Sequence, residues 1–573
     1  MKKLNGLIEN AETQNFLMSI NLFFYHNVLH KIFFINYYKL LFVIVTFLLL
    51  VANIRGDSKY QQATDKSAVS EDKHVLTNDD NDDRISEIWH NDISPRIKSI
   101  DITSANSIYG AQVDLMFVVY GVYVLNRVNE QEELVSGINA ILKKLPWIKR
   151  LRMDATNLDP WLADLNKSGP MNRRVFPTKD AKGVIYYDSL STFQFCYLLS
   201  HLAKTIVGSK QQNQRSSSEQ EFLKEVIPFL CDEIVIPLYT DIEAIWYSDS
   251  GGNCKNMKEL IYKKINYKKY TKMKKKSYFR AISDQELFMF GIASDLIYID
   301  NKMKTFSTEQ RSTLNDVIAT CYKVMKNRLS QEGFLFDIGV WDDHPDHAYA
   351  GYYGPSPLPA PDPKDPDKYK LENQTADSSH SHRLSWWFTS YRDAYPSGCE
   401  QYTYYTDALK RLAAHFTRRI LTDFPPLKNQ RPRLQNYTNG NNGWYCPQSI
   451  SYPPNELSST AEYGSWNILA LYDDDVRIFN RAMRAWIQSG SDLMRMGTDD
   501  LADNNVFIDP AQCAIDPFNV SQETTNCPKD DDNKLSISSD AGSSKLLSRS
   551  SNLSDKGTRF ELYSIFSEKI GLN

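Results

Sequence analysis

The chain has 573 residues, is 42% hydrophobic, 24% charged and 12% aromatic, and carries a formal net charge of −4 at pH 7. A chain of this length holds two domains or one very large domain, and its composition is that of a folded protein. The near-balance of charges excludes the basic excess that marks general nucleic-acid-binding proteins, so we expect no nucleic acid partner.

The N-terminal residues carry a targeting signal. Residues 40–52 form an apolar run that only Thr46 interrupts, and Lys31 and Lys39 precede it. Extended further back, the run reaches the ~20 residues that a membrane-spanning helix needs. Alone, it fits the ~7–15 apolar residues of a cleaved secretory signal. We therefore expect residues 1–55 to be a retained anchor or a signal peptide, and the rest of the chain to be membrane-anchored or secreted.

The eight cysteines fit an exported chain, and they include no Cys-x-x-Cys pair and no zinc-ligand spacing. Cys513 and Cys527 flank a polar loop and are the best candidates for a disulfide. Cys196, Cys231 and Cys321 lie in apolar helical stretches, which predicts buried thiols.

Most of the chain has a helical pattern. Residues 56–99 are polar and acidic and predict a flexible stalk. From residue 100 onward, apolar residues recur at spacings of three and four, as in amphipathic helices. The predicted helices are 111–128, 131–145, 189–207, 219–247, 286–301, 308–329, 385–391, 406–424, 459–471 and 476–489. We expect a mainly α fold over residues 100–424, built of antiparallel helix pairs and arranged as an α/α toroid or a helical bundle, of which we favour the toroid.

The C-terminal part of the chain is less regular. Residues 425–455 are rich in Pro, Asn and Gly and predict loops. We treat residues 425–527 as a separate C-terminal region. Residues 528–573 are rich in Ser, Asp and Lys and predict a low-complexity tail.

One stretch departs from the overall charge balance. Ten lysines lie between Lys255 and Lys276, against the single acid Glu259, with tyrosines interleaved. We interpret Lys268 and Lys269 as part of a contact with an acidic polysaccharide. The alternative is a solvated basic loop without a partner.

The densest group of reactive side chains lies between Trp341 and Gly354. Two histidines, three aspartates and three tyrosines share these fourteen residues. Asp343 is placed to cap a helix whose first turn holds Pro345. His344 and His347 are spaced i,i+3, which is weak evidence for a metal without a third ligand, so we expect no metal and no cofactor. The composition instead indicates a cleft for proton chemistry.

These residues resemble a known family. The run from Phe336 to His344, followed by Ala-Tyr-Ala-Gly-Tyr-Tyr-Gly from Ala348, is similar to the His-to-Tyr segment of the hyaluronate and chondroitin lyases. Phe290-Gly-Ile-Ala and Lys304-Thr-Phe-Ser-Thr-Glu-Gln are similar to two preceding motifs of that family. Within the family, the N-terminal anchor and stalk resemble the chondroitin-lyase-like envelope proteins of baculovirus occlusion-derived virions. The similarity covers residues 284–354. The resemblance also implies antiparallel β-sheets after the toroid, and because few alternating strands follow, we expect residues 425–527 to hold an incomplete, remnant β domain or to lack the sheets.

The resemblance implies β-elimination of a uronic-acid glycosaminoglycan of the chondroitin or hyaluronan type. Tyr353 or Tyr352 would then remove the proton beside the uronate carboxylate, assisted by His344. An acidic polysaccharide is the implied partner. The side chains that would hold the sugar are Trp341, Trp386, Trp387 and His347.

The chain departs from the family pattern at two places. Asp284 stands where the family has an asparagine, and a carboxylate there repels a uronate. No arginine pair matches in recognisable form, and Arg383 and Arg392 are stand-ins by position only, Arg392 for a catalytic arginine and Arg383 for a substrate-binding one.

Two other interpretations remain open. A glycoside hydrolase on the same helical scaffold would use two carboxylates, with Asp342 or Asp343 paired with Glu462 or Asp393. A non-catalytic, polysaccharide-binding attachment protein would keep the lysine stretch and lack turnover.

Overall fold

The structure is a computed structural model. It describes residues 86, 89–101, 105–144, 176–179, 185–241, 256–266, 277–331, 333–353, 372–424, 432–446, 452–459 and 465–488. All of them belong to one compact unit, Asp82–Asn573. The predicted anchor, the tail, the Cys513–Cys527 disulfide, Glu462, Lys268 and Lys269 lie outside the described residues.

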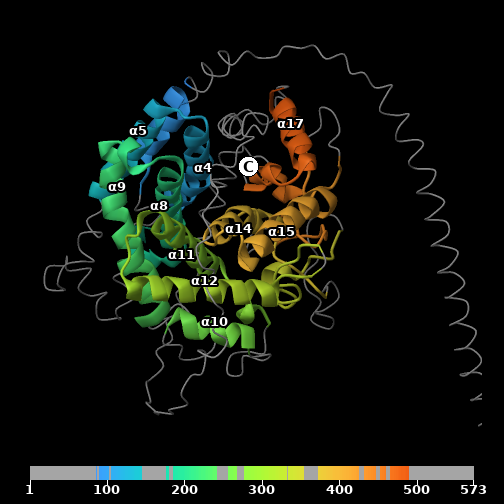
Figure 1. The fold of residues 1–573 in the computed structure, drawn as a ribbon. Helices are drawn as coiled ribbons and strands as arrows, with labels where there is room; N and C mark the ends of the chain where they lie inside the picture. Colours follow the sequence, from blue (N-terminus) through green and yellow to red (C-terminus); the bar gives the residue numbers. More distant parts are fainter. Residues whose placement is uncertain are drawn as a thin grey trace, which may run out of the picture. The chain divides into compact units, whose positions relative to one another are not determined.

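The described chain is mainly α-helical, as predicted (Figure 1). Its longer helices are α4 (Ala105–Val124), α5 (Val128–Lys144), α8 (Ser189–Ser209), α9 (Ser217–Pro228), α10 (Met257–Asn266), α11 (Asp284–Met303), α12 (Thr308–Arg328), α14 (Leu384–Asp393), α15 (Glu400–His415) and α17 (Asp474–Gln488). The shorter segments are η2 (Trp89–Ile93), α3 (Ser94–Ser99), η5 (Gln212–Gln214), η6 (Phe229–Val235), η7 (Pro237–Asp241), η9 (Ser277–Arg280), η10 (Pro345–His347), α13 (Ser378–Ser381), η11 (Phe416–Ile420), η12 (Glu456–Ser459) and η13 (Ser465–Leu471). In these ranges the only strands are β1 (Phe176–Lys179) and β2 (Ile185–Asp188), an antiparallel pair with Phe176 opposite Asp188.

Local sequence explains where the central helices start. Helices α9, α11 and α12 each begin with a capping box, in which a serine and the Glu or Gln three residues later satisfy each other's backbone N–H groups. Helix α11 ends at Lys304, which adopts the left-handed conformation (φ 56°) that stops a helix.

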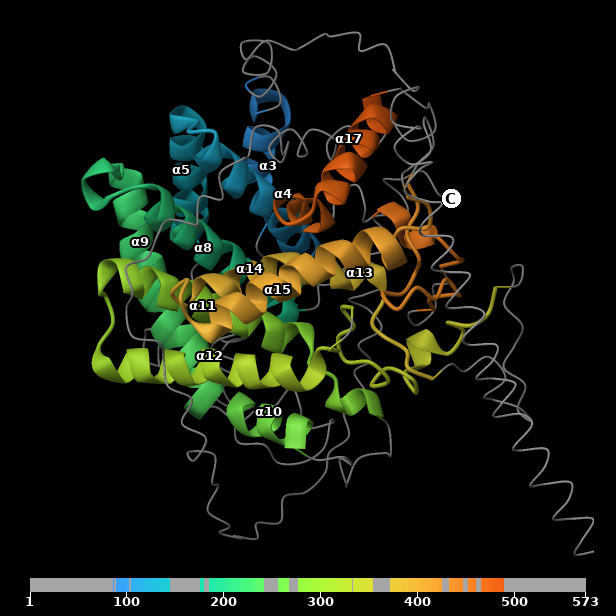
Figure 2. The ribbon, with the colours of Figure 1, turned by 45° about the vertical axis from the view of Figure 1, so that its right-hand side comes forward.

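Helix α11 is the centre of the core. It is buried from Glu286 to Asp300, and it packs against α8, α12 and α14. Helix α8 in turn packs on α4, and α14 on α15, so that α4, α8, α11, α14 and α15 follow one another as neighbours (Figure 2). Because a helix enclosed on all sides must be apolar all round, α8 and α11 lack a continuous polar face.

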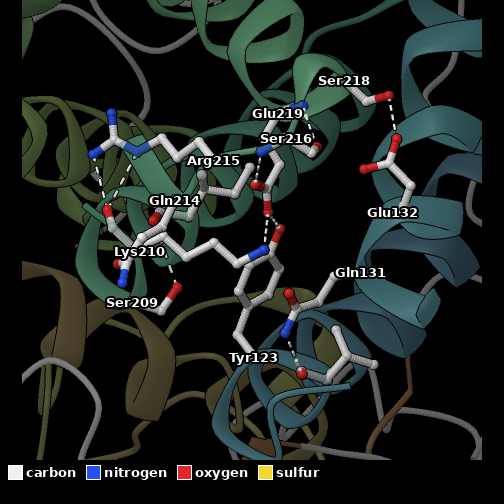
Figure 3. Close-up of polar contacts among 12 residues, drawn as sticks. Tyr123, Gln131, Glu132, Ser209, Lys210, Gln214, Arg215, Ser216, Ser218 and Glu219 are labelled. Atoms are coloured by element: carbon white, nitrogen blue, oxygen red, sulfur yellow. Dashed lines mark hydrogen bonds and ion pairs between the residues drawn. The ribbon is translucent and has the colours of Figure 1, made fainter. Parts of the chain in front are cut away.

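Glu219 ties three helices together at the N-terminal side of the core (Figure 3). Its carboxylate accepts hydrogen bonds from Tyr123 Oη of α4 (2.7 Å), from Lys210 Nζ at the end of α8 (2.8 Å) and from Ser216 N (2.8 Å). Burial, and then the adjacent Glu219 charge, raises the pKa of Tyr123. A single buried acid therefore fixes the α4–α8–α9 corner.

A second charged group lies at the middle of the core. Lys204 Nζ of α8 is 2.6 Å from Asp393 Oδ2 of α14 and 3.5 Å from Asp295 Oδ1 of α11, and all three side chains are buried. Arg392 binds the other Asp393 oxygen at 2.7 Å, while Ser200 Oγ donates to Asp295. Two positive and two negative charges thus neutralise one another where helices α8, α11 and α14 meet. We call these four residues the core ion network.

Loops form a separate layer beside the helices. Its small core consists of Ala350, Tyr437, Tyr445 and Leu457, with Tyr452 against them. The segments are joined by isolated β-bridges such as Asp377↔Tyr437 and Tyr445↔Tyr452, and not by a sheet. Residues far apart in sequence therefore meet here through loops.

The expected remnant β domain is not seen in the described part of residues 425–527. No strand occurs there, and Trp466, Phe479 and Met483 belong to the same hydrophobic core as α14 and α15. The Pro- and Asn-rich loops do not alternate apolar and polar residues, so they cannot build a sheet face.

The predicted stalk ends earlier than residue 99. Trp89, Ile93 and Ile97 lie in η2 and α3 and are buried in the main core. Trp89 Nε1 donates to Glu133 of α5 at 2.6 Å. The three apolar side chains recur every four residues and anchor η2 and α3 to the main core. The acidic residues that precede them made the whole segment resemble a flexible stalk.

Two further predictions concern the cysteines and the membrane-spanning segment. Cys196, Cys231 and Cys321 are buried free thiols, as predicted, whereas Cys399 is disulfide-bonded to a partner outside the described residues. None of the described helices combines the length and the apolar character that a membrane crossing requires.

Candidate functional site

The reactive segment identified in the sequence is held in place by its own aspartates. Asp342 accepts hydrogen bonds from Gln374 N (2.6 Å) and Asn373 N (3.2 Å). Asp343 accepts from Ser277 N (2.6 Å) and Ser277 Oγ (2.7 Å) and so anchors η9. The prediction that Asp343 caps the helix of Pro345 is wrong, because His344 is the cap residue of the short η10 turn.

A second anchor lies upstream of this segment. Asp337 is buried, accepts from Ile282 N at 2.7 Å and pairs with Arg328 at 3.1 Å. Burial raises its pKa to about 6, against the lowering effect of Arg328. Its φ of 53° is the left-handed turn that redirects the chain toward Trp341. The loop is thus fixed against the N-terminal end of α11.

The histidines of the segment lie in a cluster of rings. His344 is 4.7 Å from Tyr278, 5.4 Å from Trp341 and 5.1 Å from His347, measured between ring centroids. Further rings continue from His347, with Tyr437 at 5.3 Å and Tyr445 at 5.7 Å, and Tyr445 is 6.4 Å from His380. We call this set the histidine–aromatic cluster; it comprises Tyr278, Trp341, His344, His347, His380, Tyr437 and Tyr445.

The cluster is buried in its middle and open at its ends. His347 and Tyr445 are buried, whereas the side chains of His344 and His380 are 19% and 29% exposed. Burial, and then the charges of Asp343 and Asp346, raises the pKa of Tyr278. The two end histidines are therefore the members that can meet a ligand.

His344 has a defined tautomer. Its Nδ1 accepts a hydrogen bond from the backbone N–H of Asp346 at 3.2 Å. The Asp346 carboxylate is farther away, at 3.9 Å, so the backbone bond governs the ring. Because Nδ1 acts as acceptor, the neutral imidazole carries its proton on Nε2. His344 consequently presents a hydrogen-bond donor.

His380 has the opposite tautomer. Its Nδ1 lies 2.8 Å and 3.0 Å from the two oxygens of Asp377, a buried carboxylate that can only accept. Although burial acts to raise it, the pKa of Asp377 is held far below its usual value by His380, Ser379 and His347. The same carboxylate caps α13 by accepting from His380 N. Nε2 of neutral His380 is then an acceptor.

The sequence interpretation missed His380. Its signal is the spacing Asp377-Ser-Ser-His380, in which the cap residue of a helix and the residue three positions later face each other. Tyr437 and Tyr445 gave no comparable signal, since only the fold of the loops brings them to His347.

Gly443 brings two loop segments into close contact. A Cβ atom placed there would lie 1.8 Å from the backbone oxygen of Ala350 and 2.6 Å from that of Tyr349. The neighbouring Trp444 N donates to Tyr349 O at 3.1 Å, and Cys446 N donates to Asp346 O at 3.0 Å. The backbone carrying Tyr445 can therefore run directly along residues 346–350.

The two candidate tyrosines lie at the end of this segment. Tyr353 is 60% exposed, and Tyr352 is partly exposed and contacts Tyr349 with a centroid distance of 6.5 Å. The described contacts of His344 do not include Tyr353. Their catalytic roles remain predictions.

Asp284 and Arg383, both named from the sequence, meet in the structure. The Arg383 guanidinium, nearly buried, pairs with the Asp284 carboxylate, whose side chain is 27% exposed. The guanidinium also lies over the Phe288 ring at 5.8 Å. The carboxylate that stands in the place of the family's asparagine therefore neutralises the arginine.

Four assignments are corrected by burial. Trp386 and Trp387 are fully buried, Trp386 against Phe117 and Trp387 against Phe288, so neither can stack on a sugar. Arg392 is buried in the core ion network and cannot reach a substrate. His347 is buried among rings and supports the cluster from within. Trp341, which is partly exposed, keeps its predicted place.

The described lysines of the basic stretch are all paired. Lys258 binds Asp316 at 2.6 Å, Lys263 binds Glu259 at 2.7 Å, and the buried Lys264 binds Glu286 at 2.7 Å. These three serve the fold, which leaves the predicted polyanion contact to residues outside the described ranges.

Across the described residues, no three His, Cys, Asp or Glu side chains are arranged to hold a metal ion. No family model, curated protein or solved structure matches this chain, so the site has to be interpreted from its own geometry.

Proposed function

We propose that the chain is a polysaccharide lyase-like protein that cleaves uronic-acid glycosaminoglycans by β-elimination at the histidine–aromatic cluster. The observation that carries this proposal is His344, a part-exposed imidazole whose Nδ1 accepts a backbone hydrogen bond and whose ring contacts Tyr278 and Trp341. A neutral donor suits a uronate, because it can hydrogen-bond the carboxylate as negative charge develops on it.

The chemistry requires two proton movements. The proton on the carbon beside the carboxylate must leave, and the glycosidic oxygen that departs must gain one. His344 holds the carboxylate, Trp341 offers a ring face at the same end of the cluster, and Tyr353 or Tyr352 exchanges a proton with the sugar. Arg383 supplies positive charge if Asp284 is displaced or neutralised.

Two further features agree with the proposal. The order of neighbouring helices α4, α8, α11, α14 and α15 is compatible with an α/α toroid. The disulfide of Cys399 fits an oxidising compartment, as expected for a membrane-anchored or secreted protein or one in a virion envelope.

The second candidate is a non-catalytic polysaccharide-binding protein. The Asp284–Arg383 pair favours it, because a paired arginine cannot neutralise the uronate as strongly. A two-carboxylate hydrolase has less support. The carboxylates of Asp342 and Asp343 both accept hydrogen bonds from backbone N–H groups, and Asp393 is buried in the core ion network.

The test is turnover by the purified full chain of chondroitin and hyaluronan. A lyase forms an unsaturated uronate that absorbs in the near ultraviolet, and a hydrolase does not. Tyr353→Phe and Tyr352→Phe form a matched pair, of which one should abolish product and the other retain it. Binding of both polysaccharides without any unsaturated product would support the non-catalytic candidate.

A further inference from the structure

The two open ends of the histidine–aromatic cluster have complementary hydrogen-bonding character. His344 presents an Nε2–H donor because its Nδ1 accepts the Asp346 N–H. His380 presents an Nε2 acceptor because its Nδ1–H is held by Asp377 at 2.8 Å. A donor and an acceptor imidazole on one cluster are the two groups that an acid–base reaction needs.

The environment of His380 is that of an activated base. A buried carboxylate that accepts the Nδ1 proton orients the ring and stabilises the imidazolium that forms when Nε2 takes a proton. Asp377 is itself fixed by capping α13 and by a β-bridge to Tyr437. Tyr353 is 60% exposed, and the described residues give it no buried carboxylate partner of the kind that orients His380.

His380 belongs to the same site as His344. Asp377 interacts electrostatically with His347 as well as with His380, and His347 is in ring contact with His344. Tyr445 fills the space between His347 and His380, with centroid distances of 5.7 Å and 6.4 Å. A uronic-acid polysaccharide carries many carboxylates along its length, so the His344 end can hold one uronate while another uronate at the His380 end loses its proton.

We propose that His380, positioned by Asp377, is the general base of this site and removes the proton beside the uronate carboxylate. This inference rests on the proposed lyase function. The carbon–hydrogen bond breaks and its proton goes to His380 Nε2. The electron pair forms the carbon–carbon double bond, the bond to the glycosidic oxygen breaks, and that oxygen takes a proton from the tyrosine hydroxyl. Solvent then returns the proton from the imidazolium to the phenolate.

The first measurement does not depend on turnover. Nitrogen NMR of the full chain, labelled with ¹⁵N at its ten histidines, reports the tautomer of each ring, with His380→Gln and His344→Gln used for assignment. We expect the Nδ1–H form for His380 and the Nε2–H form for His344. An Nε2–H form of neutral His380 would overturn the proposal, since no acceptor would face the substrate.

The second measurement is turnover of chondroitin. His380→Gln should lower kcat by about 100-fold or more, and His380→Ala should recover activity with added imidazole. His90→Gln, at an exposed histidine outside the cluster, should leave activity unchanged. An active wild type with a fully active His380→Gln variant refutes this base while the lyase function stands. A wild type that makes no unsaturated product refutes both.

The pH profile separates a base from a structural residue. Activity should rise with pH because the general base must be neutral, and Asp377→Asn, which retains a capping side chain but cannot stabilise an imidazolium, should lower kcat and move that limb of the profile to lower pH. The titratable groups facing His380 are Asp377, His382, His347 and Tyr445. If the rising limb of the pH–activity profile has the same position in Asp377→Asn as in the wild type, the limb belongs to another of these groups. That result would remove His380 from the mechanism.

Discussion

The core ion network and the histidine–aromatic cluster use the same kinds of side chain in opposite ways. In the core, Lys204 and Arg392 are buried against Asp295 and Asp393, so every charge is matched by another. In the cluster, aspartates accept hydrogen bonds from backbone N–H groups and from histidine, and the end imidazoles are partly exposed. The two regions therefore differ in access to solvent and not in the density of charged groups, because the core ion network is buried whereas His344 and His380 are partly exposed.

The largest expected effect comes from breaking the core ion network. Lys204→Met leaves Asp393 and Asp295 buried without their lysine, which should cost about 3–5 kcal/mol of unfolding free energy. Chemical denaturation followed by circular dichroism measures it. The control is Arg433→Gln, which breaks an ion pair with Asp423 that is about half exposed and should cost less than about 1 kcal/mol. Equal losses would mean that the network is not a structural centre.

Gly443→Ala tests whether close backbone contact builds the cluster. The added methyl group would collide with Ala350 O, and relief requires the two loops to separate, at a cost of about 1–3 kcal/mol. We expect a small loss of stability and a complete loss of polysaccharide turnover. Gly398→Ala, where a Cβ meets nothing within 4 Å, is the matched control and should change neither. Retained activity in Gly443→Ala would separate the Tyr445 side of the cluster from function.

The stability that Asp337 contributes to the fold should depend on pH. Its pKa is raised by burial from 3.8 to about 6, so the folded protein binds a proton there more tightly than the unfolded chain. The stability from this group is full below about pH 4 and is lost as pH rises through 6. Asp337→Asn, which tolerates the positive φ, lacks this dependence but also loses the pair with Arg328.

The measurement is the difference in unfolding free energy between wild type and Asp337→Asn from pH 4 to pH 7. That difference should move in favour of the variant as pH rises. A constant difference would show that Asp337 stays ionised throughout this range, with Arg328 outweighing burial.

Sequence patterns predicted the helices well because apolar periodicity follows directly from packing. The same periodicity could not distinguish Trp386 and Trp387 in the core from aromatic rings lining a cleft, since both faces of α14 are enclosed. The core ion network was equally hidden, because Lys204, Asp295 and Asp393 each look like a surface charge until three helices meet. The sequence identified His344 because the residues of its motif all lie within one short segment, from Trp341 to Gly354. The Asp377–His380 dyad lies in a polar stretch that has no apolar periodicity to indicate a structured site.

The smallest expected effect is at the start of α11, where Asp284 pairs with Arg383. Asp284→Asn removes the charge that neutralises Arg383 and that repels a uronate, so turnover of chondroitin should rise several-fold. Arg383→Gln should lower it, since the positive charge is then absent. Because the Asp284 side chain is partly exposed, the loss of the ion pair should cost little stability. If Asp284→Asn has an unchanged or lower rate, Arg383 serves only to fix the start of α11, and the positive charge that the reaction needs must come from elsewhere in the chain.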